Sequence, residues 1–231
     1  AGTKSLVSKH LTKEVWEQLK DAKDEQGVSF KTCVLSGCQN IDSGIGCYAG
    51  SHAGYTQFGA LFDPIILEYH GHAKDAEHVS DMQYDKLNCP PFSAEDDKMI
   101  KSTRIRVGRN LAKFPLGPGI SREQRNEVES DAQKAFASFT GELAGSYYSL
   151  SSMSAEQQKQ LIADHFLFKE GDRYLEACGL NRNWPEGRGI FHNEAKTFLI
   201  WVNEEDQLRI FSMQQGSGIF EVFERLCKAA S

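Results

Sequence analysis

The chain has 231 residues, 40% of them hydrophobic and 10% aromatic, which is enough for a packed core in one large domain or two modest ones. Its formal net charge of −6 argues against general affinity for nucleic acid or anionic membranes, although it allows a local basic pocket. No apolar run approaches the roughly 20 residues that a membrane-spanning helix needs, and the first residues lack the apolar core of a signal peptide. We therefore expect a cytoplasmic protein with no nucleic-acid partner and no membrane partner.

The cysteines and histidines do not form a strong metal or disulfide pattern. The six cysteines show no C-x-x-C pair and no regular spacing, so we expect mostly buried thiols rather than a disulfide framework or a zinc knuckle. His70, His72 and His78 lie close together with two acids between them, but this stretch has the composition of a polar linker, which makes a metal site the less favoured interpretation.

The first seventy residues carry a helical pattern. Thr12 and Ser29 stand where they would cap two amphipathic helices. A third amphipathic segment runs from about residue 55 to 69, and we expect Pro64 to kink or interrupt it. These segments predict a small all-helical domain over residues 1–75. The second helix is expected to turn three apolar residues inward: Phe30, Val34 and Leu35.

A glycine-rich stretch, DSGIGCYA, lies between the second and third helices at residues 42–49. It contains G-x-G-x-x-A, but the dinucleotide-binding fingerprint requires a strand before it within a βαβ unit, and here a helix precedes. We therefore reject a Rossmann interpretation. A flexible loop with Tyr48 near its middle is suited to closing over a small ligand, and a plain interhelical turn is the alternative.

A polar linker is expected over residues 76–97, and a strand follows it. A two-residue alternation places Ser102, Arg104 and Arg106 on one face of this strand and apolar residues on the other. Two guanidinium groups one pleat repeat apart can bind oxyanions bidentately, which suits a polyphosphate better than a single carboxylate. An edge strand with protective charges is the alternative.

Two capping boxes, beginning at Ser121 and Ser154, predict two further helices, with a short strand near residues 146–150 between them. His165 follows the second of these helices and is flanked by aromatic residues. A core histidine is the commoner interpretation of such a residue, and a base-stacking or catalytic role is the rarer one.

The chain is organised around Thr197–Gln215. Phe198–Val202 is apolar on both alternating faces, which predicts a central strand covered on both sides. Three carboxylates at residues 204–206 follow at a hairpin tip, and the next strand carries Arg209. Carboxylates this close repel one another, and a fold tolerates them most readily where a cation, a metal or a cationic substrate meets them. A solvated acidic turn beside one arginine is the alternative.

The fold class predicted for the whole chain is α+β. The helical domain precedes a larger domain, residues 98–231, in which a mainly antiparallel sheet is flanked by helices. An arginine strand, an acidic hairpin and a closable loop together suggest a polyphosphate on one side and a cationic group on the other, which is the layout of phosphoryl transfer. Walker, protein-kinase, G-x-S-x-G and H-E-x-x-H motifs do not occur.

Several long motifs, in fixed order over essentially the whole chain, resemble the phosphagen (guanidino) kinases. They are SGIGCY, LFDPIILEYHG, STRIRVGR, DHFLFKEGDRYL, WPEGRGIFHN and FLIWVNEEDQLRIFSMQQG. The resemblance implies reversible transfer of the ATP γ-phosphoryl group to the guanidinium of L-arginine, with ATP/ADP and magnesium as cofactors, in a monomer or homodimer. The resemblance further implies that the length of the small-domain loop tracks the size of the guanidino substrate. The loop of this chain has the length found in members that use arginine, which favours arginine over creatine, although Cys47 and Gly50–Ala53 depart from the commonest forms.

The resemblance also implies roles for individual residues. Glu205 and Arg209 would be catalytic, Glu204 would act near magnesium through water, and the pair Asp42 and Arg173 would join the two domains. The implied nucleotide-binding residues are Ser102, Arg104, Arg106, His165 and Arg209. The implied substrate-binding residues are Gly44, Ile45, Tyr48 and Glu205.

Members of the family carry a further C-terminal third, with a reactive cysteine, more phosphate-binding arginines and a mobile loop bearing a second substrate carboxylate. This chain lacks it, so we expect a truncated catalytic domain, from a fragment, a shorter isoform or an incomplete sequence. Two alternatives stay open: a non-catalytic fragment that binds nucleotide or a partner, and a kinase for another guanidino substrate.

Overall fold

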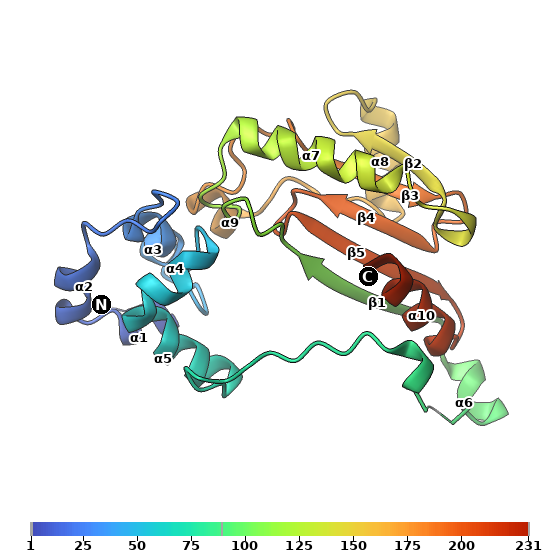
Figure 1. The fold of residues 1–231 in the computed structure, drawn as a ribbon, viewed down its shortest axis with the longest axis horizontal. Coiled ribbons are helices and arrows are strands. Elements are labelled where there is room, and N and C mark those ends of the chain that lie inside the picture. Colours follow the sequence, from blue (N-terminus) through green and yellow to red (C-terminus); the bar gives the residue numbers. More distant parts are fainter. Residues whose placement is uncertain (1, 89, 231) are drawn as a thin grey trace. The chain divides into compact units, whose positions relative to one another are not determined.

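The computed structural model describes residues 2–88 and 90–230 (Figure 1). The strands are β1 (Ser102–Arg109), β2 (Gly145–Ser149), β3 (Gly189–Asn193), β4 (Phe198–Val202) and β5 (Leu208–Gln215). The helices are α1 (Leu6–His10), α2 (Lys13–Leu19), α3 (Phe30–Gln39), α4 (His52–Gln57), α5 (Gly59–His70), η1 (Tyr84–Lys86), α6 (Ala94–Met99), α7 (Arg122–Phe136), η2 (Gly141–Leu143), α8 (Ala155–Ala163), α9 (Arg173–Ala177) and α10 (Ile219–Ala230). Within the described part of the chain, no helix is both long enough and apolar enough to cross a bilayer.

The chain forms two compact units, each made of three stretches of sequence. The first comprises Ala1–His78, Asn110–Gln124 and Glu170–Trp184, and the second comprises Val79–Arg109, Arg125–Lys169 and Pro185–Ser231. Two segments that the sequence analysis placed within residues 98–231 therefore pack in the first unit. The second unit consists of the rest of residues 98–231 together with residues 79–97.

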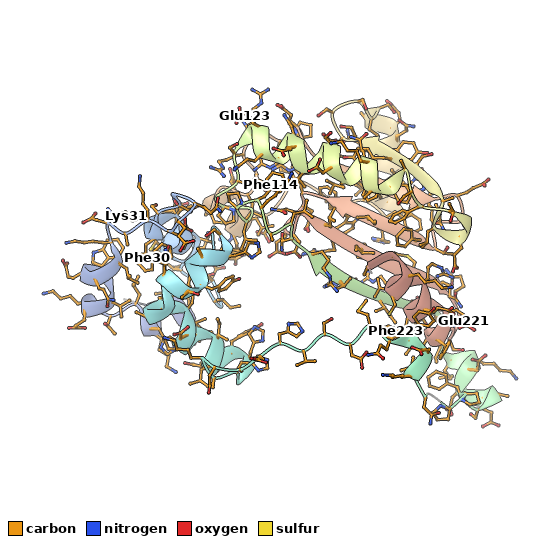
Figure 2. All side chains as sticks on the ribbon, in the orientation of Figure 1. Phe30, Lys31, Phe114, Glu123, Glu221 and Phe223 are labelled. Atoms are coloured by element: carbon orange, nitrogen blue, oxygen red, sulfur yellow. The ribbon has the colours of Figure 1, made fainter. Side chains whose placement is uncertain are left out.

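The first unit is a helical cluster around buried aromatic side chains. Phe30 and Phe58 are fully buried, and their rings meet edge to face with centroids 5.3 Å apart. Figure 2 shows Phe30 directed into this unit while the neighbouring Lys31 extends outward. Three helices begin at the expected kind of cap, because the hydroxyl groups of Ser5, Thr12 and Ser29 each accept a backbone N–H from the first helical turn.

Two local predictions in this unit are wrong. Leu35 is 40% exposed, and Cys33 is buried in its place, because the inward stripe of α3 follows the i, i+3, i+4 spacing from Phe30 through Cys33 and Val34. The third helix is interrupted at Phe58 rather than at Pro64. Phe58 has non-helical backbone angles, and α5 continues through Pro64.

The second unit contains a five-stranded antiparallel sheet in the order β1-β5-β4-β3-β2. β4 is the middle strand and is buried on both faces, as predicted for Phe198–Val202. The α+β prediction of a helical N-terminal region followed by an antiparallel sheet flanked by helices is confirmed.

Two helices cover one face of this sheet, which we call the helix face and which carries Ile200, Phe191 and Ser212 (Figure 1). The Phe136 ring of α7 lies 4.7 Å from that of Phe191, and Arg225 of α10 donates from Nη1 to the Ser212 hydroxyl at 3.2 Å. The opposite face carries the side chains described next and is partly covered by Phe168, whose ring lies 5.3 Å from that of Trp201.

Candidate functional site

Three arginines share the other face of the sheet. In the β1–β5 register, Arg104 lies opposite Met213, Arg106 opposite Phe211, and Gly108 opposite Arg209. Directly opposed residues of an antiparallel pair point to the same side. We call this side the arginine face, and the predicted alternation of β1 is confirmed by the strictly alternating exposure of its residues.

Arg104 and Arg106 are exposed, and neither guanidinium group forms an ion pair or a hydrogen bond within the described part of the chain. Ser102 is exposed at the start of β1 on the same face. β1 is also an edge of the five-stranded sheet. β1 is therefore an edge strand, as the alternative interpretation predicted. This position is compatible with anion binding, because both guanidinium groups are open to a ligand.

The acidic turn between β4 and β5 is fixed by the buried residue Asn203, through both its backbone N–H and its side-chain amide. Asn203 has a left-handed backbone angle, φ 57°, and its N–H donates to the Gln207 carbonyl at 2.9 Å. The Asn203 side-chain amide donates to the backbone carbonyls of Arg125 and Gly187 at 3.1 and 2.7 Å. Because asparagine tolerates this conformation and satisfies two buried acceptors, the turn is preorganised. Its carboxylates are held in a defined place.

Arg209 lies among these carboxylates. Its Nη1 is 2.8 Å from Glu204 Oε2, and its Nη2 is 2.9 Å from Glu205 Oε2 and 3.5 Å from Asp206 Oδ2. The Arg209 and Glu204 side chains are 16% and 17% exposed, whereas that of Glu205 is 43% exposed. The turn is therefore a compact charge cluster rather than a solvated acidic loop, and Glu205 is its most accessible carboxylate on Arg209.

Burial and charge act in opposite directions on this cluster. Burial raises the pKa of Glu204 and outweighs the attraction of Arg209. Burial alone would lower the pKa of Arg209, but the summed attraction of Glu204 and its two acidic neighbours raises it. Arg209 therefore stays protonated in spite of its burial.

Gly108 is a part of the site that the sequence analysis missed. A Cβ atom at this position would lie 2.5 Å from Asp206 Oδ2, so a larger residue would have to displace this carboxylate from its place beside β1. An isolated glycine inside an otherwise regular strand pattern is the signal that would have indicated such a close approach.

His165 is not a core histidine. It is exposed and has a left-handed backbone angle, φ 62°. The next residue, Phe166, accepts a hydrogen bond from Trp201 Nε1 at 2.7 Å, and Trp201 lies opposite Arg209 in the β4–β5 register. The segment that carries His165 is thus fastened to the arginine face, which is the side that the nucleotide-binding prediction requires.

In the first unit, the 42–48 loop is held by its carbonyl groups. The N–H groups of Leu6 and Val7 donate to the carbonyls of Gly44 and Ile45 at 2.9 and 3.0 Å, and the N–H of Gly37 donates to that of Gly46 at 2.9 Å. The loop is therefore a docked structure rather than a plain turn.

The loop also carries backbone N–H groups without a protein acceptor among the described residues. Within the described residues, the N–H groups of Gly44, Ile45 and Gly46 donate no hydrogen bond. Successive unpaired N–H groups in a loop form a site for an anion such as a carboxylate. Tyr48 closes this stretch, and its backbone N–H donates to the Cys33 carbonyl of α3 at 2.8 Å.

Asp42 and Arg173 form the predicted ion pair, supported by Tyr174, whose hydroxyl donates to Asp42 Oδ2 at 3.0 Å. The hydrogen bond from Tyr174 lowers the pKa of Asp42, and a backbone hydrogen bond and the charge of Arg173 lower it further. Both residues of the pair belong to the first unit, and both are exposed. The pair connects two distant stretches of sequence within that unit, and its role between domains stays a prediction.

The donor atoms of the acidic turn bear on whether magnesium fits this site. Among the described residues, no three His, Cys, Asp or Glu side chains are placed to hold a metal ion together. Magnesium commonly binds to substrate phosphates, waters and only one or two carboxylates. A site in which Glu204 contributes through water and a nucleotide contributes phosphate oxygens is compatible with these residues.

Comparisons with known proteins give one family. Residues 1–67 match the model for the N-terminal domain of ATP:guanido phosphotransferases, and residues 127–231 match the model for their C-terminal catalytic domain. Over 99% of its length, the chain is 50% identical to an arginine kinase of Anthopleura japonica and 46% identical to the arginine kinase Lit v 2 of Penaeus vannamei. It spans 32% and 64% of those two proteins, respectively.

Solved structures agree with this assignment. The fold matches a crystal structure of lombricine kinase with a TM-score of 0.93 and 38% identity, over 99% of this chain and 63% of that one. It matches the duplicated taurocyamine kinase of Schistosoma mansoni with a TM-score of 0.91 and 34% identity, over 99% of this chain and 32% of that one. The chain therefore belongs to the ATP:guanido phosphotransferase, or phosphagen kinase, family.

Proposed function

We propose that the chain carries the nucleotide-binding and guanidino-binding residues of an enzyme that reversibly moves the γ-phosphoryl group of MgATP to the guanidinium of L-arginine. The guanidino nitrogen forms a bond to the γ-phosphorus while the bond from that phosphorus to the bridging oxygen of ADP breaks, and the nitrogen loses a proton. Positioning and charge neutralisation supply most of the catalysis in such reactions.

The nucleotide is assigned to the arginine face. Arg104 and Arg106 have open guanidinium groups, and both would bind phosphate oxygens bidentately. Arg209, from the adjacent strand, would neutralise charge that develops during transfer. Ser102 and His165 are assigned to the same nucleotide, since both belong to segments on this face.

The substrate guanidinium is assigned to Glu205. This carboxylate is the most accessible of those that contact Arg209, and a carboxylate accepts two parallel N–H bonds from a guanidinium. The amino-acid end of the substrate is assigned to the N–H groups of Gly44 and Ile45 and to Tyr48. Magnesium, held by the nucleotide phosphates with Glu204 acting through water, would supply further charge neutralisation.

Support for arginine as the substrate comes from the relatives. The relatives that are 46–50% identical are named arginine kinases, whereas the solved structures include a lombricine kinase and a taurocyamine kinase at 34–38% identity. A cytoplasmic location and a monomeric or homodimeric state remain predictions for this chain.

One observation carries the proposal: three arginines share one sheet face, and a fixed acidic turn lies at the end of that face. The test is a coupled assay of ADP formation from MgATP with L-arginine, lombricine, taurocyamine and creatine in parallel. We expect turnover with L-arginine and much weaker turnover with the others. Turnover with another guanidino compound and none with arginine would correct the substrate.

A second candidate function is binding without turnover, and the reason to retain it is that the chain spans 64% or less of the arginine kinases to which it is similar. Isothermal titration with MgADP and L-arginine, combined with the coupled assay with MgATP and L-arginine, separates the two candidates. Binding of both ligands with no product formed would identify a binding module, whereas product formation would identify an enzyme.

A further inference from the structure

The 42–48 loop is docked onto a single turn of α3. Tyr48 donates its N–H to the Cys33 carbonyl, and Gly46 accepts the N–H of Gly37, at 2.8 and 2.9 Å. The carbonyl of residue i and the N–H of residue i+4 face each other in an α-helix, so Cys33 and Gly37 offer the two polar groups of one turn. The loop forms a hydrogen bond with each of these two groups, the Cys33 carbonyl and the Gly37 N–H, and so lies directly against the backbone of α3.

This contact requires the absence of a side chain at residue 37. A Cβ atom on Gly37 would lie 2.5 Å from the Gly46 carbonyl oxygen and 2.8 Å from the Gly46 Cα. Both of these atoms are backbone, so no side-chain rotation relieves the clash. Gly46 is equally constrained, because its φ of 91° lies in the left-handed region and a Cβ there would lie 3.3 Å from that of Ser5.

Glycine is also an unfavourable residue at this position in its own helix. Gly37 lies in the last turn of α3, and glycine costs up to about 1 kcal/mol relative to alanine within a helix. Local helix formation therefore favours alanine, and the close approach of Gly46 is the feature of the structure that excludes it.

We infer that Gly37 is a positioning residue for the guanidino substrate: by admitting the Gly46 backbone, it sets how far the amide groups of Gly44 and Ile45 project from α3. This inference rests on the proposed function, which assigns the substrate carboxylate to those amides. The helix α1 acts as the second support, because the N–H groups of Leu6 and Val7 donate to the carbonyls of the same two residues.

The expected size of the effect follows from the geometry. Ordinary contacts begin at 3.4 Å, so a methyl group on Gly37 would displace the loop by about 1 Å. Misplacement of a substrate by about 1 Å can cost on the order of 100-fold in rate. The nucleotide-binding arginines belong to the other compact unit, so nucleotide affinity should not change.

The test compares Gly37→Ala with Gly54→Ala in the full chain. Gly54 lies in helix α4 of the same unit, and its added Cβ would meet its nearest atom at 3.4 Å, an ordinary contact. Affinities for L-arginine, agmatine and MgADP are measured by titration calorimetry, and folding is checked by thermal unfolding. Agmatine carries the guanidinium and the amine but no carboxylate, so it reports binding that does not use the amide groups of Gly44 and Ile45.

We expect Gly37→Ala to lower L-arginine affinity about 10-fold or more and to leave agmatine and MgADP affinities unchanged. Gly54→Ala should leave all three unchanged. Equal L-arginine affinity in folded Gly37→Ala and wild-type protein would overturn the role of Gly37 and leave the proposed function intact. A wild-type chain that binds no guanidino compound would instead refute the proposed function, and the role of Gly37 with it.

A second pair of variants decides the matter if Gly37→Ala does not fold. Leu6→Pro removes the N–H that supports Gly44, and Leu6 is the first residue of α1, where proline is tolerated. Lys13→Pro is its control, because Lys13 is the exposed first residue of α2. Loss of L-arginine affinity only in Leu6→Pro supports the inference that the docked loop positions the amide groups that bind the substrate. Equal affinity in the two variants contradicts that inference.

Discussion

Arg209 and Glu205 hold each other, with Nη2 of the arginine 2.9 Å from Oε2 of the glutamate. In the proposed reaction Arg209 binds a phosphate and Glu205 binds the guanidinium of the substrate. In the structure Arg209 binds a carboxylate in place of the phosphate, and Glu205 binds the guanidinium of Arg209 in place of that of the substrate. Ligand binding therefore requires an exchange of partners. This exchange couples the two substrate sites through one ion pair.

The first prediction concerns Glu205→Gln. The neutral amide no longer attracts a guanidinium, so L-arginine affinity should fall and turnover should drop about 100-fold or more. MgADP affinity should stay the same or rise, because Arg209 loses one competing carboxylate. Titration calorimetry and the coupled assay measure these quantities, and a parallel loss of MgADP affinity would remove Glu205 from its assigned role.

The second prediction concerns the open arginines. Arg104→Ala and Arg106→Ala should each weaken MgADP binding by about 10-fold to 100-fold, since a hydrogen bond to a charged group contributes about 1.5–3 kcal/mol. Arg109→Ala is the matched control, because Arg109 lies on the same strand but on the helix face. Equal losses in all three variants would indicate general electrostatic attraction rather than a built phosphate site.

The third prediction concerns Gly108. Gly108→Ala should displace Asp206 and destabilise the protein by about 1–2 kcal/mol, because the added methyl group overpacks the contact between β1 and the acidic turn. Urea unfolding measures the change in the free energy of unfolding. The double variant Gly108→Ala, Asp206→Ala removes the clashing carboxylate, so its loss should be smaller than the sum of the two single losses. Strict additivity would show that the two residues do not interact.

The fourth prediction concerns alkaline stability. Tyr147 donates its hydroxyl to Glu129 Oε1 at 2.6 Å, and burial, followed by this bond, raises its pKa above the ordinary value of 10. The folded state therefore keeps a proton that the unfolded state loses above pH 10, so the stability contributed by Tyr147 is present below pH 10 and falls above it.

Tyr147→Phe removes this titration and the hydrogen bond together. It should cost about 1 kcal/mol at pH 8, and the difference from the wild type should shrink as the pH rises above 10. The measurement is urea unfolding of both proteins at each pH. A constant difference between pH 8 and pH 11 would contradict the assigned shift.

The fifth prediction concerns thiol reactivity. Burial raises the pKa of Cys33 to about 11 and that of Cys47 to about 12, whereas Cys38 is exposed. In a Cys89→Ser variant, a disulfide reagent at pH 8 should modify Cys38 quickly and the other four cysteines slowly, because the thiolate is the reactive form. All five should react in denaturant. Rapid modification of Cys47 in the folded protein would show that the 42–48 loop opens readily.

Local patterns in the sequence predicted much of this structure. The two-residue alternation of β1, the doubly buried β4 and the capping boxes depend on neighbours within a few residues, and each is present. The two-residue alternation also explains why Arg104, Arg106 and Arg209 share one face, because β1 and β5 pair in the register that aligns them. Their binding roles still await the experiments above.

The remaining features depend on contacts between distant segments. The residues next to Gly37 in sequence do not indicate that the backbone of Gly46 packs against it. Those next to Gly108 do not indicate that the carboxylate of Asp206 does so there. The exposure of His165 depends on the anchoring of its neighbour by Trp201, and the inclusion of residues 110–124 and 170–184 in the first unit depends on long-range packing. Composition and periodicity do not contain such information.

The first unit draws its parts from three separate stretches of chain, and this bears on how the protein is made. The Ser36 hydroxyl, for example, donates to the carbonyl of Tyr174, 138 residues later. During synthesis the early helices leave the ribosome long before α9 exists, so the unit cannot complete its packing until most of the chain has been translated. Nascent chains paused before residue 170 should therefore depend more on chaperones than chains paused after residue 184.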